Sequence, residues 1–217
     1  MGNEVPKENP LIFDKPISTI ITQGSQIEVF ILWKNIFLEF FLLLQNNLKI
    51  NKIPNGWKEL HHEVELGVVI GQPGKFIKEE NAMNHVLGYV LALDMTARHI
   101  QDKLKKAGHP WLLAKGFDTS CPISDFIPKS QVADVNNLNL VLKVNGVVKQ
   151  NGTTSDMIYK LPTLIAYISK YFKLEYGDLI LTGTPSGVSP VKHGDVIEAN
   201  LNDLAHIKFP VVELQPE

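Results

Sequence analysis

The feature that most constrains the fold is a succession of short strand-like segments that fills the chain from residue 60 to its end. The clearest pair flanks Asn145-Gly146, a dipeptide that favours the type I′ turn of a β-hairpin. Apolar-rich runs of strand length occur at residues 63–70, 88–94, 138–144, 147–150, 178–182 and 195–199. Strands this short and this frequent predict several sheets joined by tight connections.

Helical spacing is confined to a few stretches. It occurs at residues 79–87, 96–107 and 161–172. We expect Gly108 to end the second stretch, Thr96 or Asp94 to cap its start, and Pro162 to lie in the first turn of the third. Few helices among many strands predict a mixed, strand-dominated α+β fold rather than a doubly wound sheet.

Composition narrows the class of protein. A chain of 217 residues that is 44% hydrophobic can bury one substantial core. The 21 basic and 23 acidic residues give a net charge of −2 without an extended basic run, so we expect no nucleic-acid partner. Cys121 is the single cysteine, lies before a proline in a predicted turn, and is predicted to be an inert thiol in a reducing compartment. No targeting signal is readable in residues 1–10.

Residues 29–52 differ from the rest of the chain, because they contain no Gly, Pro, Ala, Ser, Thr, Asp or Arg. We therefore divide the chain into residues 1–28, an anomalous hydrophobic insertion at 29–52, and a main domain at 53–217. The insertion is a poor membrane span, since its densest part, residues 29–44, is short and carries Lys34 and Glu39. Our hypothesis is a translated intron, because A- or T-rich codons can encode every residue type in it except tryptophan. A membrane-surface anchor is the alternative.

Three carboxylates indicate a site. Glu63 and Glu65 are two residues apart, so both project from the same face of the predicted strand. Asp94 ends another apolar strand, and carboxylates near a core repel each other unless a cation or a proton compensates. Three oxygen ligands without paired cysteines favour magnesium or manganese, or calcium, over a structural zinc. Solvated acids at a strand edge are the alternative, and His61 is interpreted as hydrogen-bonding support in preference to a ligand.

The run LHHEVELGVVIG at residues 60–71 resembles the metal-binding strand of the fumarylacetoacetate hydrolase superfamily. Further matching motifs follow in the family's order, namely Asp94-Met95-Thr96-Ala97-Arg98, Gln101-Asp102, Pro110-Trp111, Ala114-Lys115 and LTGTPSGV at residues 181–188. The resemblance extends over residues 53–209 and a short piece at 11–28. It implies the family's β-roll of mixed sheets, with a few short helices, for the catalytic domain at residues 53–217.

The resemblance also implies roles for individual residues. Glu63, Glu65 and Asp94 would bind Mg²⁺ or Mn²⁺, and Arg98, Gln101, Lys115 and Thr184 would surround the substrate, with Lys115 and Arg98 as catalytic cations. The implied activity is metal-dependent hydrolysis or decarboxylation of small dicarbonyl acids through a metal-stabilised enolate. Acylpyruvate hydrolysis and oxaloacetate decarboxylation or tautomerisation are the candidate reactions. A homodimer and a mitochondrial location are implied as well, with the cytosol as the alternative and no membrane partner.

The chain departs from the family pattern at its start. Family members begin with a strand and a short lid helix, in which a His and a Glu three residues apart activate the hydrolytic water. Nothing before Leu11 resembles this segment, so we expect residues 1–28 to be truncated and the general base to be absent. The alternative function is therefore an impaired or non-catalytic member that binds metal and keto acid without hydrolysing it.

Overall fold

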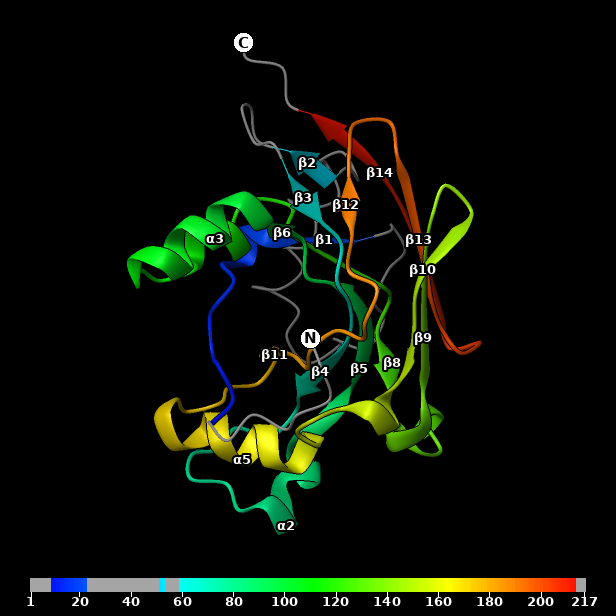
Figure 1. Cartoon of the computed structure of the whole chain (residues 1–217). Helices are drawn as coiled ribbons and strands as arrows, with labels where there is room; N and C mark the ends of the chain where they lie inside the picture. The colour runs from blue at the N-terminus through cyan, green and yellow to red at the C-terminus, as the bar shows by residue number, and fades with distance from the viewer. Residues whose placement is uncertain (1–8, 23–50, 54–58, 214–217) are drawn as a thin grey trace, which may run out of the picture.

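The computed structural model describes residues 9–22, 51–53 and 59–213 (Figure 1). The predicted insertion at residues 29–52 lies outside these ranges except for its last two residues. Residues 1–8, at the start of the predicted truncated segment, lie outside them too. No helix in the described ranges is long and apolar enough to cross a membrane.

Three sheets organise the described residues, and the two larger ones are of mixed direction. The first has the strand order β1 (Ile20–Thr22), β7 (Cys121–Ile123), β5 (Val86–Leu93), β4 (Val64–Ile70) and β11 (Leu179–Leu181), with β8 (Ile127–Pro128) paired to β5. The second has the order β10 (Val147–Thr153), β9 (Asn139–Val144), β13 (Val196–Leu201), β14 (Ala205–Glu213) and β2 (Asn51–Ile53). The third is small, with the order β12 (Pro190–Val191), β3 (Leu60–His61) and β6 (Thr96–Ala97). The pairs β1–β7 and β14–β2 are parallel and the other pairs antiparallel, which confirms the predicted mixed, strand-dominated fold.

The helices are short and lie around the sheets. The α-helices are α2 (Glu79–Ala82), α3 (Arg98–Ala107), α4 (Leu112–Lys115) and α5 (Leu161–Tyr171). The 3₁₀ turns are η1 (Ile17–Thr19), η3 (Met83–His85), η4 (Lys129–Gln131), η5 (Val135–Asn137) and η6 (Thr154–Asp156). Helices α2 and α5 lie side by side at one end of the molecule, and α3 lies apart from them (Figure 1). Pro162 occupies the first turn of α5 as predicted, because its missing N–H has no partner to lose there.

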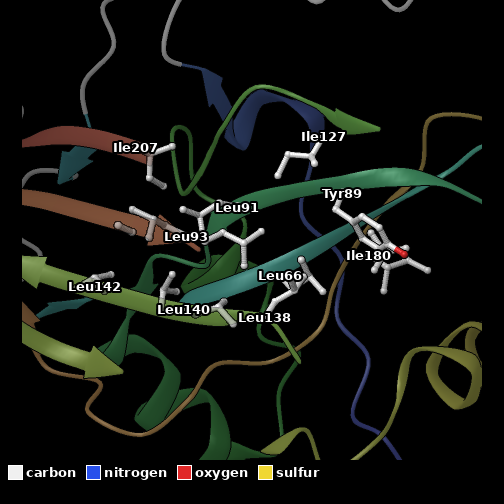
Figure 2. Close-up of a cluster of buried hydrophobic side chains, with 14 of the residues drawn as sticks. Leu66, Tyr89, Leu91, Leu93, Ile127, Leu138, Leu140, Leu142, Ile180 and Ile207 are labelled. Carbon is white, nitrogen blue, oxygen red and sulfur yellow. The ribbon is translucent and has the colours of Figure 1, made fainter. Parts of the chain in front are cut away.

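The main core lies between the first and second sheets (Figure 2). Alternation along the strands decides which side chains enter it, because successive residues of a strand face opposite ways. Leu66 of β4 and Leu91 of β5 point into this core together with Leu142 of β9. Val69 and Val90 face the other way and belong to a second, smaller apolar cluster. The first sheet is therefore covered on both faces, and its second face also carries the polar cluster described below.

The predicted hairpin is confirmed. Strands β9 and β10 are antiparallel, and Val144 pairs with Val147 across the turn. Both turn residues have positive φ, 50° at Asn145 and 80° at Gly146, as a type I′ turn requires. The local sequence was sufficient here because only glycine and asparagine adopt this conformation at little cost.

Three local predictions were wrong. Helix α3 begins at Arg98, because Thr96 belongs to β6 and its hydroxyl donates to the Asp94 carbonyl instead of capping the helix. The predicted helix at residues 79–87 is a single α-helical turn followed by η3, and β5 already begins at Val86. Cys121 lies in a strand, β7, and not in a turn. In the latter two cases strand pairing overrode the local pattern.

Candidate metal centre

The register of β4 and β5 brings the three predicted acids to one face of the first sheet. Val64 pairs with Leu93, so Glu63, just before β4, lies opposite Asp94, just after β5. The Asp94 N–H donates to the Glu63 carbonyl at 2.8 Å. Because side chains alternate along each strand, Glu63, Glu65 and Asp94 face away from the main core, which takes Val64 and Leu93.

The carboxylates lie close together and are removed from water. One oxygen from each of Glu63, Glu65 and Asp94 can be chosen so that all lie within 4.8 Å of one another. The residues are 7%, 4% and 1% exposed, so the alternative of solvated strand-edge acids is wrong. Burial, followed by the charges of Asp94 and Glu63, raises the pKa of Glu65 to about 8. Like charges at this spacing need a compensating cation or proton.

The donor set fits a hard divalent cation. Each of the three residues offers carboxylate oxygen, the ligand type that Mg²⁺ and Mn²⁺ prefer. Asp94 Oδ1 is buried and accepts no hydrogen bond, and its charged neighbour is the Lys15 ammonium at 2.9 Å. Coordination to a cation would supply the partner that this buried acceptor lacks.

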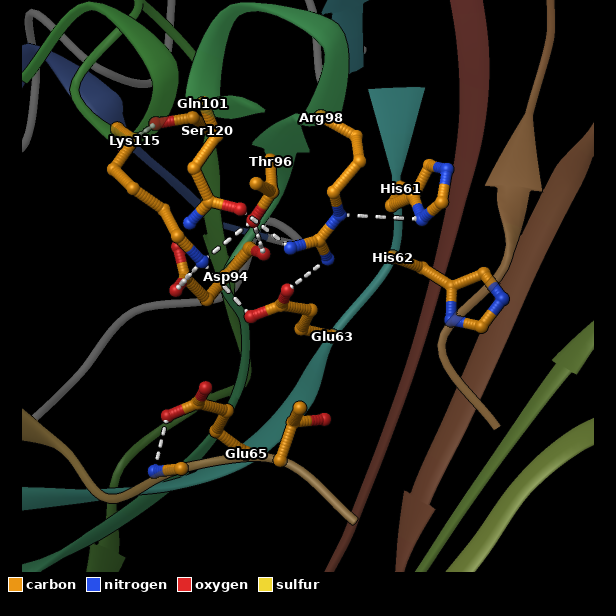
Figure 3. A network of polar contacts seen from close by, with 12 residues as sticks. His61, His62, Glu63, Glu65, Asp94, Thr96, Arg98, Gln101, Lys115 and Ser120 are labelled. Carbon is orange, nitrogen blue, oxygen red and sulfur yellow. Dashed lines mark hydrogen bonds and ion pairs between the residues drawn. The ribbon is translucent and has the colours of Figure 1, made fainter. Parts of the chain in front are cut away.

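Two side-chain cations flank the cluster (Figure 3). Lys115, the last residue of α4, donates from Nζ to Glu63 Oε2 at 2.8 Å, to Asp94 Oδ2 at 2.5 Å and to Thr96 Oγ1 at 2.6 Å. Burial alone would lower the pKa of Lys115, but the charges and hydrogen bonds of Asp94 and Glu63 outweigh burial and raise it. Lys115 is therefore a buried ammonium ion at neutral pH.

Arg98 approaches from the first turn of α3. Its guanidinium donates to Glu63 Oε1 and, through Nη1, to Gln101 Oε1 at 2.6 Å. Gln101 lies three residues further along the same helix and is buried, so it fixes the orientation of Arg98. The Arg98 Nε–H also points to His61 Nδ1 at 3.5 Å, which agrees with hydrogen-bonding support from His61.

The loop after β11 closes the cluster on the side of Glu65. The Gly183 N–H donates to Glu65 Oε2 at 2.6 Å, and Gly183 has a φ of 97°, a conformation that glycine adopts readily. Thr184 lies next in the chain, but its hydroxyl donates to the Val64 carbonyl at 2.8 Å and accepts from Gln150 Nε2 at 2.8 Å. The structure thus brings the loop to the cluster, while the Thr184 hydroxyl bonds to β4 and β10.

The site also contains Lys15, Ser120 and Gln150, for which the sequence predicts no site role. The Lys15 ammonium lies 2.9 Å from Asp94 Oδ1, and Ser120 accepts from the same ammonium. Gln150 is fully buried and links β10 to His62, whose Nδ1 lies 2.8 Å from Gln150 Oε1. Burial lowers the pKa of His62, so its ring is neutral. No spacing in the sequence relates these residues to the acids, because they are distant along the chain.

Comparison with known proteins identifies the family. The family model described as fumarylacetoacetate (FAA) hydrolase C-terminal matches residues 1–212. The mitochondrial oxaloacetate tautomerase of Bos taurus is 44% identical over 211 residues, covering 97% of this chain and 84% of that protein. The mitochondrial oxaloacetate decarboxylase of Dictyostelium discoideum is 46% identical over 214 residues, covering 98% and 87%. The crystal structure of fumarylpyruvate hydrolase from Pseudomonas aeruginosa in complex with Mn²⁺ and pyruvate has a TM-score of 0.81 at 30% identity, covering 96% and 81%. The chain therefore belongs to the fumarylacetoacetate hydrolase family.

Proposed function

We propose that this chain is a divalent-metal-dependent enzyme that acts on small α-keto and 1,3-dicarbonyl acids, with oxaloacetate as the first candidate substrate. The observation that carries the proposal is the buried group of Glu63, Glu65 and Asp94, whose ligand atoms lie within 4.8 Å of one another beside the cations of Lys115 and Arg98. The names of the relatives, an oxaloacetate tautomerase and an oxaloacetate decarboxylase, support this substrate class. They favour a working enzyme over a non-catalytic member.

Glu63, Glu65 and Asp94 would hold the cation, which we propose to be Mg²⁺ or Mn²⁺. When bound, a divalent cation supplies Lewis-acid stabilisation of negative charge on the oxygens of an α-keto acid. Glu63 would be held in place for this role by Lys115 and Arg98, which bond to its two oxygens. Glu65 would be held by the Gly183 N–H. The Mn²⁺ and pyruvate in the P. aeruginosa relative support the assignment.

The remaining residues would bind the substrate and stabilise its charge. Lys115 and Arg98 are ammonium and guanidinium donors that can face the carboxylate and keto oxygens of a bound acid. Gln101 would keep Arg98 oriented through their 2.6 Å bond. Thr184 would bind a substrate carboxylate by redirecting the hydroxyl proton that it donates to the Val64 carbonyl.

Of the candidate reactions, tautomerisation and decarboxylation of oxaloacetate require the fewest functional groups beyond those described above. Tautomerisation and decarboxylation both develop negative charge on the keto oxygen, which the cations of Lys115 and Arg98 oppose. Acylpyruvate hydrolysis also develops this charge but needs, in addition, a base that activates water. We therefore place tautomerisation or decarboxylation of oxaloacetate first and acylpyruvate hydrolysis second.

The test follows the conversion of enol oxaloacetate to the keto form by ultraviolet absorbance, with Mn²⁺ or with EDTA. We expect EDTA to abolish turnover, and Asp94→Asn to reduce it by more than about 100-fold, since losing a ligand costs more than losing an outer-shell partner. Asp195→Asn is the matched control, because Asp195 is a buried carboxylate that accepts from Lys192 N–H in a turn of the second sheet. Turnover that survives both EDTA and Asp94→Asn contradicts the proposal.

Location and assembly are proposed on the same basis. The relatives are named mitochondrial, and we propose the same compartment for this chain. We also propose a homodimer, as the family resemblance implies. Cell fractionation tests the location, and light scattering of the purified chain tests the assembly, where a monomeric mass contradicts the dimer.

A further inference from the structure

Lys15 places a third cation beside the carboxylate cluster. It lies in the segment before η1, its side chain is only 9% exposed, and Nζ lies 2.9 Å from Asp94 Oδ1. The ammonium donates to the Lys115 carbonyl, to the Ser120 carbonyl at 3.1 Å and to Ser120 Oγ at 2.9 Å. An ammonium group has three N–H donors, and these three bonds use all of them. This explains why Asp94 Oδ1 accepts no hydrogen bond although a cation is its neighbour.

The position of Lys15 is fixed by groups that carry no charge. Its three acceptors are two backbone carbonyls and the hydroxyl of Ser120, which is itself fully buried and donates to the Lys115 carbonyl at 2.8 Å. Lys15 is therefore held near Asp94 without depending on an ion pair with it. The hydrogen bonds that place this side chain beside the cluster are therefore the same whether or not a cation occupies the carboxylates.

With all three carboxylates ionised, the charges of the described cluster balance before a metal is added. Three carboxylates face three cations, those of Lys15, Lys115 and Arg98. Metal binding requires ionised carboxylates, so a divalent ion brings the whole cluster to two positive charges. A chelating dianion would neutralise this excess, whereas a monoanion would leave one charge uncompensated.

We propose that Lys15 is a charge-setting specificity residue of this site, which weakens the binding of the divalent cation and strengthens the binding of a dianionic ligand. The inference rests on the proposed function, because it takes the three carboxylates as the metal ligands. Lys15 repels a cation at Asp94 and attracts an anion bound to that cation, so its two effects have opposite signs. A side chain that only stabilised the local structure would strengthen or weaken the binding of the metal ion and of the dianion in the same direction.

The experiment measures two affinities of the full-length chain by isothermal titration calorimetry. Mn²⁺ is titrated into the metal-free protein, and oxalate, a chelating dianion, into the Mn²⁺-loaded protein, with pyruvate as the monoanion. We expect Lys15→Met to tighten Mn²⁺ binding about tenfold and to weaken oxalate binding about tenfold, as a unit charge a few ångströms from a divalent ion does at a dielectric close to that of water. Pyruvate binding should weaken by only about threefold, because its charge is smaller.

Three further variants keep the test decisive. Lys15→Arg retains the charge and should keep both affinities near those of the wild type. Ser120→Ala removes one hydrogen bond of the same ammonium without changing the charge, so it should not move the two affinities in opposite directions. Lys15→Gln, which can still donate to Ser120, repeats the neutral substitution if Lys15→Met does not fold.

The outcomes separate the two proposals. Opposite shifts of the Mn²⁺ and oxalate affinities in a neutral variant support the role of Lys15. Parallel weakening of both, or no change in either, overturns that role and leaves the proposed function standing. Failure of the wild-type chain to bind Mn²⁺ overturns the proposed function, and the inference about Lys15 with it.

Discussion

At the scale of single residues, the fold disfavours the ionised form of Glu65, and a bound cation would stabilise that form. Burial and the charges of Asp94 and Glu63 raise its pKa to about 8. We expect Glu65→Gln to raise the melting temperature of the metal-free protein at pH 8 by about 2–4 °C for each kcal/mol of repulsion removed. The amide oxygen can still accept from the Gly183 N–H. The same substitution should abolish the thermal stabilisation that Mn²⁺ gives the wild type.

Thermal unfolding with EDTA and with Mn²⁺ measures both effects. Glu198→Gln is the control, since Glu198 is a carboxylate on β13 that pairs with Lys208 at 2.7 Å, away from the cluster. This variant should keep the full Mn²⁺-induced shift. A Glu65→Gln protein that Mn²⁺ stabilises as well as the wild type would show that Glu65 is not a ligand.

Cys121 should be chemically silent in the folded chain. The thiol is buried in β7 at 2% exposure, and burial raises its pKa to about 12. Because the thiolate is the reactive species, a disulfide reagent at pH 8 should label no thiol in the native protein and one thiol after denaturation. Complete labelling of the native chain within minutes would contradict the observed burial.

At the scale of elements, Gln150 joins the second sheet to the metal-site strand. From β10 its Oε1 accepts from the Val64 N–H at 3.1 Å, and its Nε2 donates to Thr184 Oγ1 and to the Pro185 carbonyl at 2.8 and 2.9 Å. We expect Gln150→Met to lower stability by about 1–3 kcal/mol, since buried groups lose their partners. It should also weaken oxalate binding, because the loop that carries Gly183 loses the two hydrogen bonds that Gln150 donates to it. Calorimetry and chemical denaturation measure the two effects.

Thr154→Val is the matched control for this prediction. Thr154 is buried just after β10, donates from Oγ1 to the Val135 carbonyl at 2.7 Å and accepts from the Leu138 N–H at 2.9 Å. Its substitution also removes buried hydrogen bonds, so stability should fall, but oxalate affinity should not change. An equal loss of oxalate affinity in both variants would indicate a general loss of rigidity. It would contradict the prediction that Gln150 positions the loop that carries Gly183.

At the scale of the whole molecule, the described side-chain contacts of the carboxylate cluster come from Lys15, Arg98, Lys115 and Gly183, all outside residues 29–52. The translated-intron hypothesis for residues 29–52 stays a prediction. If it is correct, the mature transcript lacks the corresponding codons, and a chain without residues 29–52 binds Mn²⁺ and oxalate as well as the full chain. Transcript sequencing and calorimetry test the two parts. Uniform presence of the segment in mature message contradicts the hypothesis.

The sequence by itself determined the features that depend on near neighbours. The hairpin at Asn145-Gly146 was predictable because positive φ values restrict the residue type at each turn position. The strands around Glu65 and before Asp94 were predictable from apolar runs, and the same-face placement of Glu63 and Glu65 from the two-residue period of a strand. The family motifs indicated which of these residues to combine into one site.

Only the tertiary structure decided which distant groups meet. The antiparallel register of β4 and β5 sets Asp94 opposite Glu63, and no local pattern specifies that pairing. Lys15 meets Ser120 across 105 positions, and Gln150 meets Val64 across 86. Local propensity carries no information about such contacts, because they form only when the sheets pack and each buried donor must find an acceptor. The three acids were therefore predictable from the sequence. The contact of Lys15 with Asp94 and that of Gln150 with Val64 became visible only in the folded chain.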